Sequence, residues 1–477
     1  MSGIPFADVV RWLTEDGHLV DQISVIGAPL SRELNGACVD SRLTRAGCLF
    51  VALPGARTDG HNYVDQAVQG GATCALVASD RLAAVRRSVF GSVRLLPVDD
   101  TLAALQSLAL RWRRQFSGLT RIGITGSNGK TTVKEMLASI LGRVAPTVYS
   151  HGNFNSDIGL PMELLRIREH HRYGVFEMGM NRPGEMKLLA ELVEPNVGLI
   201  TNIGRAHIGM VGSQEAIARE KRAIFSFFTG DQTAVVPAGD RYADFLSDGV
   251  HGTVVRYSME SAGVTGVEPR GIEGSMLACR EGEIRLALPG AQMVSNAIGV
   301  ITVARLLDVP FVAIREGIEA VAPTFGRSQV IRGDVTVIQD CYNANPESMR
   351  SALELLDRTH ADGRKIAILG AMKELGEESE KAHVEIASLA LRAPLDAVWF
   401  VGDEFVRALE QSRASTERRA SEFRSFSSEE WDAVVERAGS VRGGDLVLLK
   451  ASRSLALERL TPVLTRANEA SEEAGDE

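Results

Sequence analysis

The chain has 477 residues, enough for two to four domains at the usual length of about 100–200 residues each. Hydrophobic residues make up 45% and charged residues 24%, as in ordinary globular proteins, and the formal net charge of −9 argues against nucleic acid as a partner, because phosphate backbones bind basic surfaces. Five scattered cysteines, the lack of a secretory signal and the lack of an apolar run of about 18 residues predict a cytoplasmic protein without a disulfide framework, a zinc site or a membrane span.

Residues 1–98 are predicted to form a small mixed α/β domain. The apolar runs 48–53 and 73–78 are typical of strands, and glycines punctuate the loops between them. Asp40-Ser41-Arg42 precedes the first strand, and an arginine beside a hydroxyl can clamp a phosphate. A surface turn is the more common role of such a tripeptide, and the pattern leaves both roles open.

Residues 125–132 are the most informative segment of the chain. The apolar run 119–124 before them is typical of a buried strand, and apolar residues recur after them with the spacing of one helix face. A strand, a glycine-containing loop and a helix N-terminus together bind phosphate through backbone N–H groups, although a plain glycine-rich turn is the alternative. Lys130 would add a charge on the terminal phosphates, and the Thr131 hydroxyl could ligate magnesium. We therefore predict that this loop binds a nucleotide phosphate.

Strands alternate with helical stretches in the middle of the chain, which favours a mostly parallel sheet. The predicted strand 173–177 ends on Glu177, and the predicted strand 197–203 is followed by His207. Ligands of such sheets lie beyond the carboxyl ends of the strands, so these two side chains and Thr131 are expected at one rim, where they could hold magnesium. Taken singly, a surface carboxylate and a loop histidine are the alternatives.

Two further features of the middle part are less specific. Residues 152–159 are dense in glycine and amide side chains, and such a loop either hydrogen-bonds a polar substrate or forms Asx turns. Lys221 lies in a predicted helix, where the solvated face is the ordinary place for a lysine.

From about residue 323 the chain is predicted to form a second doubly wound unit without a phosphate loop of its own. The strand 334–340 ends on Asp340, and Asn345 followed by Pro346 has the pattern of a helix N-cap and a first helical residue. Further strands are predicted at residues 365–370, 397–402 and 445–450. Two such units that face each other form a cleft with a nucleotide on one wall and an acceptor on the other.

The predicted fold is α/β with three domains: a small mixed α/β N-terminal domain (1–98), a central P-loop-type parallel-sheet ATPase domain (99–322) and a C-terminal Rossmann-like domain (323–477). Its motifs resemble those of the Mur ligase family, the ATP-dependent amide ligases that build the peptidoglycan stem peptide, over nearly the whole chain. The segments that carry the resemblance are 40–42, 49–53, 58–61, 125–132, 152–155, Glu177, 206–207, 340–348, 369–376 and 450–453. The block 340–348 is the most discriminating, because it resembles the member that adds D-alanyl-D-alanine.

The resemblance implies a reaction in two steps. ATP phosphorylates the terminal carboxylate of UDP-N-acetylmuramoyl-tripeptide to give an acyl phosphate and ADP, and the amine of D-alanyl-D-alanine then displaces phosphate. By the same resemblance the first domain holds the UDP moiety, the second ATP, and the third the dipeptide while it closes over ATP. The implied enzyme is a cytoplasmic, ADP-forming acid–amino-acid ligase of cell wall biogenesis, and so of cell shape and cell division, that acts on small-molecule substrates as a monomer.

The resemblance also assigns residues. Its catalytic residues are Lys130, His207, Lys221 and Arg327, and its magnesium ligands are Thr131, Glu177 and His207. Its ATP-binding residues are Gly126, Ser127, Asn128, Gly129, Lys130, Thr131, Thr132, Asn296 at the adenine, Arg327, and Asp340 at the ribose. Its substrate-binding residues are Ser41, Arg42, Asp59, His61, Asn153, Asn155, Asn343, Asn345 and Lys450. Lys221 falls where several relatives carry a carbamylated lysine that serves a second magnesium ion.

Five positions depart from the expected patterns. Ile124 stands where a strict Walker A motif requires glycine. Gln292 stands where the family often has histidine, Ala223 where glutamate is usual, Ala371 where aspartate is common and Ala451 where glycine is common. None of these changes removes a residue that the resemblance assigns to the phosphates or to magnesium, so we expect an enzyme.

Two other functions are compatible with the sequence. A sister Mur ligase that adds the third stem-peptide residue, diaminopimelate or lysine, would share the first two domains, but it typically carries an Asp-Asn-Pro-Arg block that this chain lacks. A nucleotide-binding scaffold with a lapsed active site is the second alternative, motivated by the departures. Such a scaffold would bind ATP without releasing ADP when both substrates are present.

Overall fold

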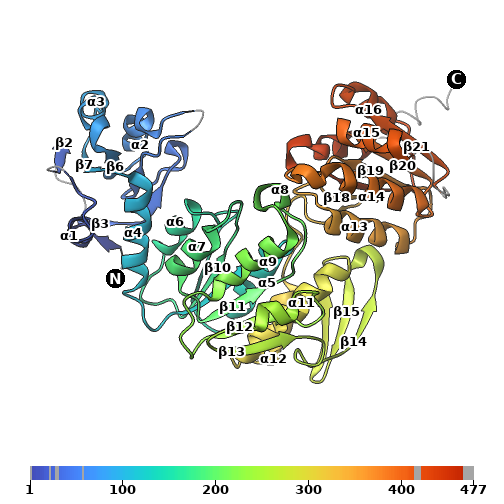
Figure 1. The fold of residues 1–477 in the computed structure, drawn as a ribbon, viewed down its shortest axis with the longest axis horizontal. Helices are drawn as coiled ribbons and strands as arrows, with labels where there is room; N and C mark the ends of the chain where they lie inside the picture. The colour runs from blue at the N-terminus through green and yellow to red at the C-terminus, as the bar shows by residue number, and fades with distance from the viewer. Residues whose placement is uncertain (1–2, 21–22, 27–31, 56–57, 413–419, 466–477) are drawn as a thin grey trace.

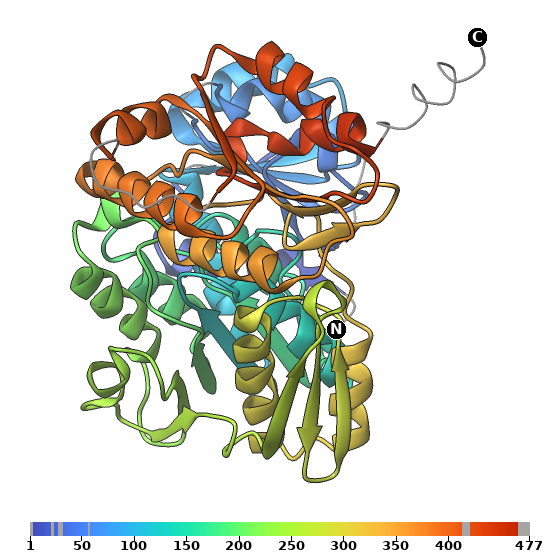
Figure 2. The same cartoon turned by 90° about the vertical axis from the view of Figure 1, so that its right-hand side faces the viewer.

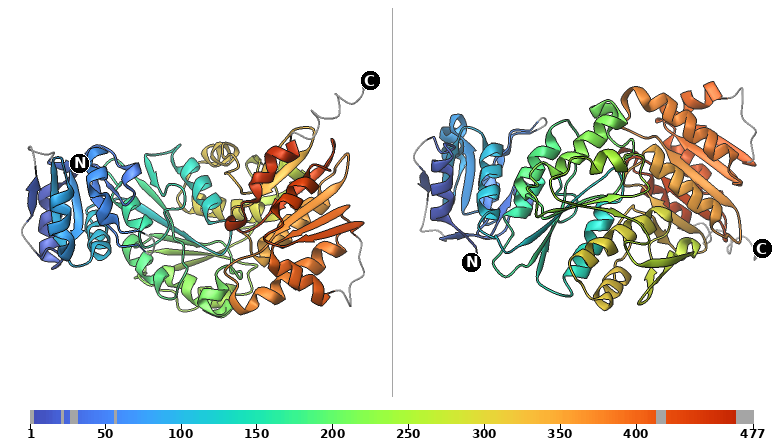
Figure 3. Two further views of the ribbon diagram at one scale, coloured as in Figure 1. Left: turned by 90° about the horizontal axis from the view of Figure 1, so that it is seen from above. Right: turned by 60° about the horizontal axis from the view of Figure 1, so that its bottom comes forward.

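Three α/β parts lie in a row, with the N-terminal and C-terminal parts on opposite sides of the central one (Figures 1 and 3). The structure is a computed structural model, and it describes residues 3–20, 23–26, 32–55, 58–412 and 420–465. The predicted three-domain α/β architecture is confirmed, since each part is built on a sheet of its own. Among the described residues, no helix is long and apolar enough to cross a membrane.

The N-terminal part is built on a five-stranded sheet of order β2-β7-β6-β5-β4, in which only β2 runs antiparallel to its neighbour. Its elements are β1 (Ile4–Pro5), α1 (Phe6–Glu15), β2 (Ser24–Ile26), β3 (Glu33–Leu34), β4 (Ala37–Cys38), β5 (Leu49–Val51), α2 (Val64–Gln69), β6 (Cys74–Ala78), α3 (Leu82–Ser88) and β7 (Val93–Val98). The two apolar runs predicted as strands are β5 and β6. They are buried because α2 and α3 cover one face of the sheet, while α1 and α4 (Thr101–Arg113) cover the other.

The central part is built on a six-stranded parallel sheet of order β13-β12-β11-β8-β10-β9. The elements of this sheet and its helices are β8 (Thr120–Thr125), α5 (Lys130–Leu141), β9 (Thr147–Tyr149), α6 (Gly159–Leu164), β10 (Tyr173–Glu177), α7 (Glu185–Val193), β11 (Val197–Ile200), α8 (Ile208–Val211), α9 (Gln214–Arg222), β12 (Thr233–Pro237), α10 (Ala243–Ser247), β13 (Thr253–Tyr257), α11 (Ala291–Leu306) and α12 (Phe311–Glu319). The chain leaves β8 towards β9 and β10 on one side and returns to β11 on the other, so the loop after β8 lies at a topological switch point, where open sheets bind ligands.

The expected alternation of strands and helices is wrong between residues 264 and 286. There the chain forms a separate antiparallel sheet of three strands, β14 (Val264–Pro269), β15 (Ser275–Cys279) and β16 (Gly282–Leu286). Figure 2 shows these strands at the lower edge of the molecule. Their apolar face packs on α11 and α12, so they cover helices of the central domain instead of extending its sheet.

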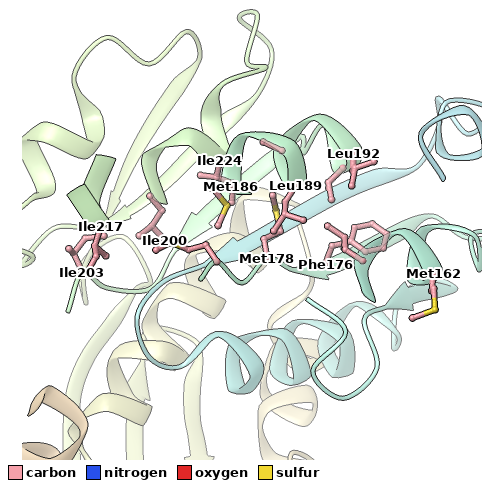
Figure 4. Packing of buried hydrophobic residues seen from close by; sticks show 14 of the residues in the cluster. Met162, Phe176, Met178, Met186, Leu189, Leu192, Ile200, Ile203, Ile217 and Ile224 are labelled. Carbon is pink, nitrogen blue, oxygen red and sulfur yellow. The ribbon is translucent and has the colours of Figure 1, made fainter. Parts of the chain in front are cut away.

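Apolar layers cover both faces of the central sheet. On one face, the helix face predicted after the loop is confirmed, because Val133, Met136 and Ile140 of α5 are all buried. On the other face, α7 packs its apolar side on the sheet, and Figure 4 shows Met186 and Leu189 among the side chains of this layer. Because both faces of the sheet are packed against helices, the ends of its strands and the loops that follow them are held in place.

The C-terminal part is a second doubly wound sheet, of order β17-β18-β22-β19-β20-β21, with only β17 antiparallel. Its elements are β17 (Gln329–Ile331), β18 (Thr336–Asp340), α13 (Pro346–Arg358), β19 (Lys365–Gly370), α14 (Ser379–Arg392), β20 (Ala397–Val401), α15 (Asp403–Ser412), β21 (Glu422–Phe426), α16 (Trp431–Ala438), β22 (Leu446–Lys450) and α17 (Thr461–Thr465). The predicted strands and the predicted cap of α13 are confirmed: the Asn345 side chain accepts a hydrogen bond from the Ser348 N–H at 2.9 Å. The carboxyl ends of β18 and β22 face the central domain, where the candidate site lies.

Candidate active site

A cavity of about 410 Å³ lies between the central and C-terminal domains. The loop after β8, the end of β10 and the segment after β11 form one wall, and the ends of β18 and β22 contribute to the other. The predicted site residues that line it are Ser127, Asn128, Gly129, Lys130, Thr131, Thr132, Asn153, Asn155, Glu177, His207, Arg327, Asp340, Asn343 and Lys450. Residues that are far apart in the sequence therefore meet at strand ends, as the parallel topology predicts.

Glycine is required at two positions of the loop after β8. Gly126 and Gly129 have φ angles of 151° and 84°, and a Cβ atom at these positions would lie 1.8 Å from the Thr201 hydroxyl and 2.4 Å from the Asn296 side chain. Helix α5 begins directly after the loop, so its first backbone N–H groups have no helical partners. The loop and the helix start thus supply the donors and the positive dipole end that bind a phosphate.

Two lysine side chains converge on one carbonyl of this loop. The Nζ atoms of Lys130 and Lys221 donate to the Gly126 oxygen at 2.8 and 3.0 Å. Lys221 is 1% exposed, so the expectation of a solvated face is wrong: α9 turns this residue into the core. Burial, and then the charge of Lys130, hold the pKa of Lys221 well below its ordinary value. Burial also lowers the pKa of Lys130, while the nearby Glu177 acts in the opposite direction.

Glu177 carries an unsatisfied acceptor at the cavity wall. Its side chain is 2% exposed, which excludes the alternative of a surface carboxylate, and Asn155 donates to its Oε1 at 2.7 Å. Its Oε2 is buried without a hydrogen-bond partner. Among the described residues, no group of three or more His, Cys, Asp or Glu side chains is placed to hold a metal by itself. The orphaned carboxylate oxygen is a ligand type that magnesium prefers, so Glu177 fits the predicted ion, and the ligand role of Thr131 stays a prediction.

His207 joins the two domains. It has a left-handed φ of 63°, and its Nδ1 lies 2.7 Å from Oε2 of Glu374, which follows β19 in the C-terminal domain. This close contact with His207 holds the pKa of Glu374 below its usual range. Because Nδ1 faces this carboxylate, an ion would have to be bound through Nε2 or displace Glu374, and the magnesium role of His207 stays a prediction.

Comparison with known families identifies the chain. Family models described as "Mur ligase family, catalytic domain", "Mur ligase middle domain" and "Mur ligase, glutamate ligase domain" match residues 33–113, 124–304 and 326–453. The chain belongs to the Mur ligase family. The predicted resemblance is thereby confirmed.

Similar Mur ligases span nearly the whole chain. The UDP-N-acetylmuramoyl-tripeptide–D-alanyl-D-alanine ligase of Treponema pallidum is 42% identical over 444 residues, which are 91% of this chain and 95% of that protein. The Bacillus subtilis enzyme of the same name is 32% identical and covers 90% of this chain and 92% of its own. A crystal structure of MurF from Acinetobacter baumannii superposes with a TM-score of 0.81 at 30% identity, covering 98% of this chain and 100% of that one. The MurF ligase of Thermotoga maritima, solved in complex with ADP, gives a TM-score of 0.74 at 27% identity, with 92% and 98% covered.

The C-terminal wall of this Mur ligase presents two cations and a carboxylate. Lys450 is 1% exposed, and its Nζ lies 2.7 Å from Oδ2 of Asp340 and donates to the Asn343 carbonyl at 3.1 Å. The Arg327 guanidinium stacks over the Tyr342 ring, 4.1 Å from its centroid. Lys450 is therefore paired with Asp340, and Arg327 is the second cation on this wall.

Two predicted ligand residues lie behind the cavity wall of the Mur ligase. Asn345 is 2% exposed, and besides capping α13 its Nδ2 donates to Oδ1 of Asn128 at 2.7 Å. Asn296 is 1% exposed, and its Oδ1 accepts from Nε2 of Gln292 at 3.1 Å, so the departure at position 292 orients this amide. The ligand roles predicted for Asn345 and Asn296 stay predictions, since both amides have partners within the protein.

The predicted residues of the N-terminal domain do not line this cavity. The Ser41 hydroxyl donates to Gln66 at 2.8 Å, and Arg42 pairs with Asp40 at 2.6 Å in an exposed turn, the alternative that the pattern left open. The other two residues contact each other: Nδ1 of His61 lies 2.6 Å from the Asp59 carboxylate, and its Nε2 accepts from a backbone N–H of β6 at 2.8 Å. Their contact with a UDP moiety stays a prediction.

No sequence pattern predicts the residues that join the central and C-terminal domains of the Mur ligase. Arg205 follows β11, and its Nε donates to Glu347 of α13 at 2.8 Å, while its terminal nitrogens donate to Glu385 of α14 at 2.8 and 3.1 Å. The backbone N–H of Gly209 donates to the Glu374 carbonyl at 3.0 Å. Arg205 lies two residues before His207, but no pattern names its partners, because they lie in another domain.

Proposed function

We propose that this Mur ligase joins D-alanyl-D-alanine to UDP-N-acetylmuramoyl-tripeptide, converts ATP to ADP and phosphate, and acts in the cytoplasm as a monomer. One observation carries the proposal: the phosphate loop 125–132 and the discriminating block 340–348 face each other across one cavity. Relatives that bear this name and share nearly the whole chain support it. We propose that residues 1–98 bind the UDP moiety, residues 99–322 bind ATP and residues 323–477 bind the dipeptide.

Phosphate transfer in the proposed reaction needs charge and position more than it needs a nucleophile of the protein. The N–H groups at the start of α5 and the Lys130 ammonium would hold the β- and γ-phosphates. Arg327 and Lys450 lie across the cavity, where they would neutralise charge on the transferred group and on the acyl phosphate. The amine of the dipeptide then attacks the acyl carbon, and the bond to phosphate breaks.

A magnesium ion, when bound, supplies charge neutralisation at the phosphate oxygens. We propose that Thr131 and Glu177 hold it, with His207 as a third ligand once its contact with Glu374 opens. The unpartnered Glu177 oxygen supports this assignment, since burying a carboxylate oxygen without a partner is costly.

We further propose that Lys221 carries a carbamate. A neutral amine adds CO₂ and releases a proton, and the burial that lowers the pKa of Lys221 favours the neutral form. Ala223 replaces the glutamate that is usual in the family, so a carbamate on Lys221 would show that the modification does not require that glutamate. In ¹³C-bicarbonate, wild-type protein should show a carbamate carbon signal that Lys221→Ala lacks, and bicarbonate should not restore activity to the variant. A variant that turns over at the wild-type rate would contradict the proposal.

One coupled assay tests the reaction. Purified protein, ATP and magnesium are given UDP-muramoyl-tripeptide with D-alanyl-D-alanine, or the dipeptide-stage precursor with diaminopimelate, and phosphate release is measured. We expect release only with D-alanyl-D-alanine, and we expect Lys130→Ala to abolish it while thermal unfolding stays unchanged. Release only with diaminopimelate would identify the sister ligase, and ATP binding without any release would identify a scaffold.

A further inference from the structure

Two cysteine thiols of the N-terminal domain lie in contact. Sγ of Cys38, at the end of β4, is 3.3 Å from Sγ of Cys48, which directly precedes β5. The parallel register places Cys38 opposite Phe50, and Cys48 lies two residues before Phe50, so both thiols face the same side of the sheet. The contact is therefore a consequence of strand register, and both cysteines are free.

The pair differs from an inert core thiol in its access to solvent. Cys48 is buried at 6% exposure, but Cys38 is only half-buried. It ends β4, which is the edge strand of the sheet and has one neighbouring strand among the residues that the structure describes. A small oxidant can therefore reach the pair from the edge without opening the core.

The ionisation of the five thiols also differs. A hydrogen bond from Cys38 lowers the pKa of Cys48, and the same contact raises the pKa of Cys38. Burial raises the pKa of Cys74, of Cys279 and, to about 12, of Cys341. The Cys38–Cys48 contact thus lowers the pKa of one thiol of the pair, and the thiolate is the form of a cysteine that attacks an oxidant.

We propose that Cys38 and Cys48 form a modification site, a dithiol that a peroxide oxidises to an intramolecular disulfide. The thiolate of the pair attacks one peroxide oxygen, the O–O bond breaks, and the leaving hydroxide takes up the proton that the thiol lost, so that a sulfenic acid and water result. The second sulfur then attacks the sulfenic sulfur, the S–O bond breaks, and a second water leaves. Both cysteines are oxidised and the peroxide is reduced, and a dithiol reductant reverses the modification.

The disulfide would act on the loop between the two cysteines. Forming it brings the sulfur atoms from 3.3 Å to about 2.0 Å, and because β4 and β5 are already paired at the spacing of a sheet, the side chains and the loop between the cysteines must shift. The closed ring contains Ser41 and Arg42. That these residues hold the UDP moiety rests on the proposed function, whereas the disulfide itself does not. Displacing them should raise KM for the UDP-linked substrate about tenfold, the effect of roughly 1.4 kcal/mol of lost binding, and leave KM for ATP unchanged.

The test uses the full chain, hydrogen peroxide and intact-mass spectrometry. We expect the treated protein to lose the mass of two hydrogen atoms, peptide mapping to place the link between Cys38 and Cys48, and dithiothreitol to restore the reduced mass. The matched control is Cys74→Ala, which removes a fully buried thiol of β6 and should still form the link. Cys38→Ser, at the half-buried edge position, and Cys48→Ala should not.

Two results would overturn the proposal independently of the ligase reaction. Oxidation that stops at sulfinic acid, or a link that uses another cysteine, would show that the pair is not a dithiol site. An oxidised protein with the mapped link but an unchanged KM for the UDP-linked substrate would refute the effect on the loop. If the protein has no ligase activity at all, the proposed function is refuted, but the mass measurement still shows whether Cys38 and Cys48 form a disulfide.

Discussion

Substitution of Arg205 tests how the central and C-terminal domains are held together on the two sides of the cavity. Its guanidinium joins the central domain to carboxylates on two helices of the C-terminal domain, Glu347 and Glu385, and its own backbone N–H donates to Glu347 at 3.0 Å. Although burial opposes the charged form, hydrogen bonds to Glu385 and Glu347 raise the pKa of Arg205 above its ordinary value. Arg205→Ala would leave both carboxylates without this cation.

The size of the effect follows from the partial burial of the network. The Arg205 side chain is 19% exposed, and the two glutamates are 36% and 29% exposed, so each contact is worth less than a fully buried one. Hydrogen bonds to charged groups contribute about 1.5–3 kcal/mol when buried, and exposed ion pairs about 0.2–1 kcal/mol. We take about 2–3 kcal/mol for the whole network, which corresponds to a fall of roughly 30- to 150-fold in kcat/KM if turnover requires the two walls to meet.

The assay is phosphate release at varied concentrations of each substrate. We expect Arg205→Ala to have a lower kcat/KM for all substrates, with little change in the free energy of unfolding of either domain. The matched control is Arg350→Ala, because Arg350 pairs with Glu385 within the C-terminal domain and does not bridge the domains. If Arg205→Ala and Arg350→Ala have the same kinetics, the network does not hold the walls together.

Two further changes test the loop and the acid stability of the central domain. Gly129→Ala should weaken nucleotide binding by about 1–3 kcal/mol, because its Cβ would lie 2.4 Å from Asn296 at a left-handed φ, whereas Gly118→Ala, with no atom within 4 Å of its Cβ, should bind nucleotide normally in a fluorescence titration. The hydrogen bond from Arg113 lowers the pKa of Glu194 from 4.5 to about 2, so this pair stabilises the fold above the unfolded pKa and loses its effect as the pH falls through the folded pKa. Glu194→Gln should therefore reduce the free energy of unfolding at neutral pH, and urea titrations should show the difference from wild type vanish between pH 4.5 and pH 2; a constant difference would contradict the assignment.

The sequence by itself determined the local elements of the site. The loop before Lys130 could be predicted because a glycine-containing turn between an apolar strand and an apolar helix face is a local pattern, and β10 ends on Glu177 as its apolar run indicates. The N-cap at Asn345 also follows from its immediate neighbours. These features depend on residues within a few positions of each other, so periodicity and turn chemistry are sufficient to find them.

Only the tertiary structure decided which side chains are buried and what they contact. A lysine in a predicted helix is ordinarily solvated, but the packing of α9 places Lys221 at the Gly126 carbonyl. Cys38 and Cys48 are unremarkable in the sequence and touch because two strands pair in one register. The partners of Arg205 lie in another domain, and a sequence pattern carries no information on contacts made across such a separation, because they arise from how whole sheets and helices pack.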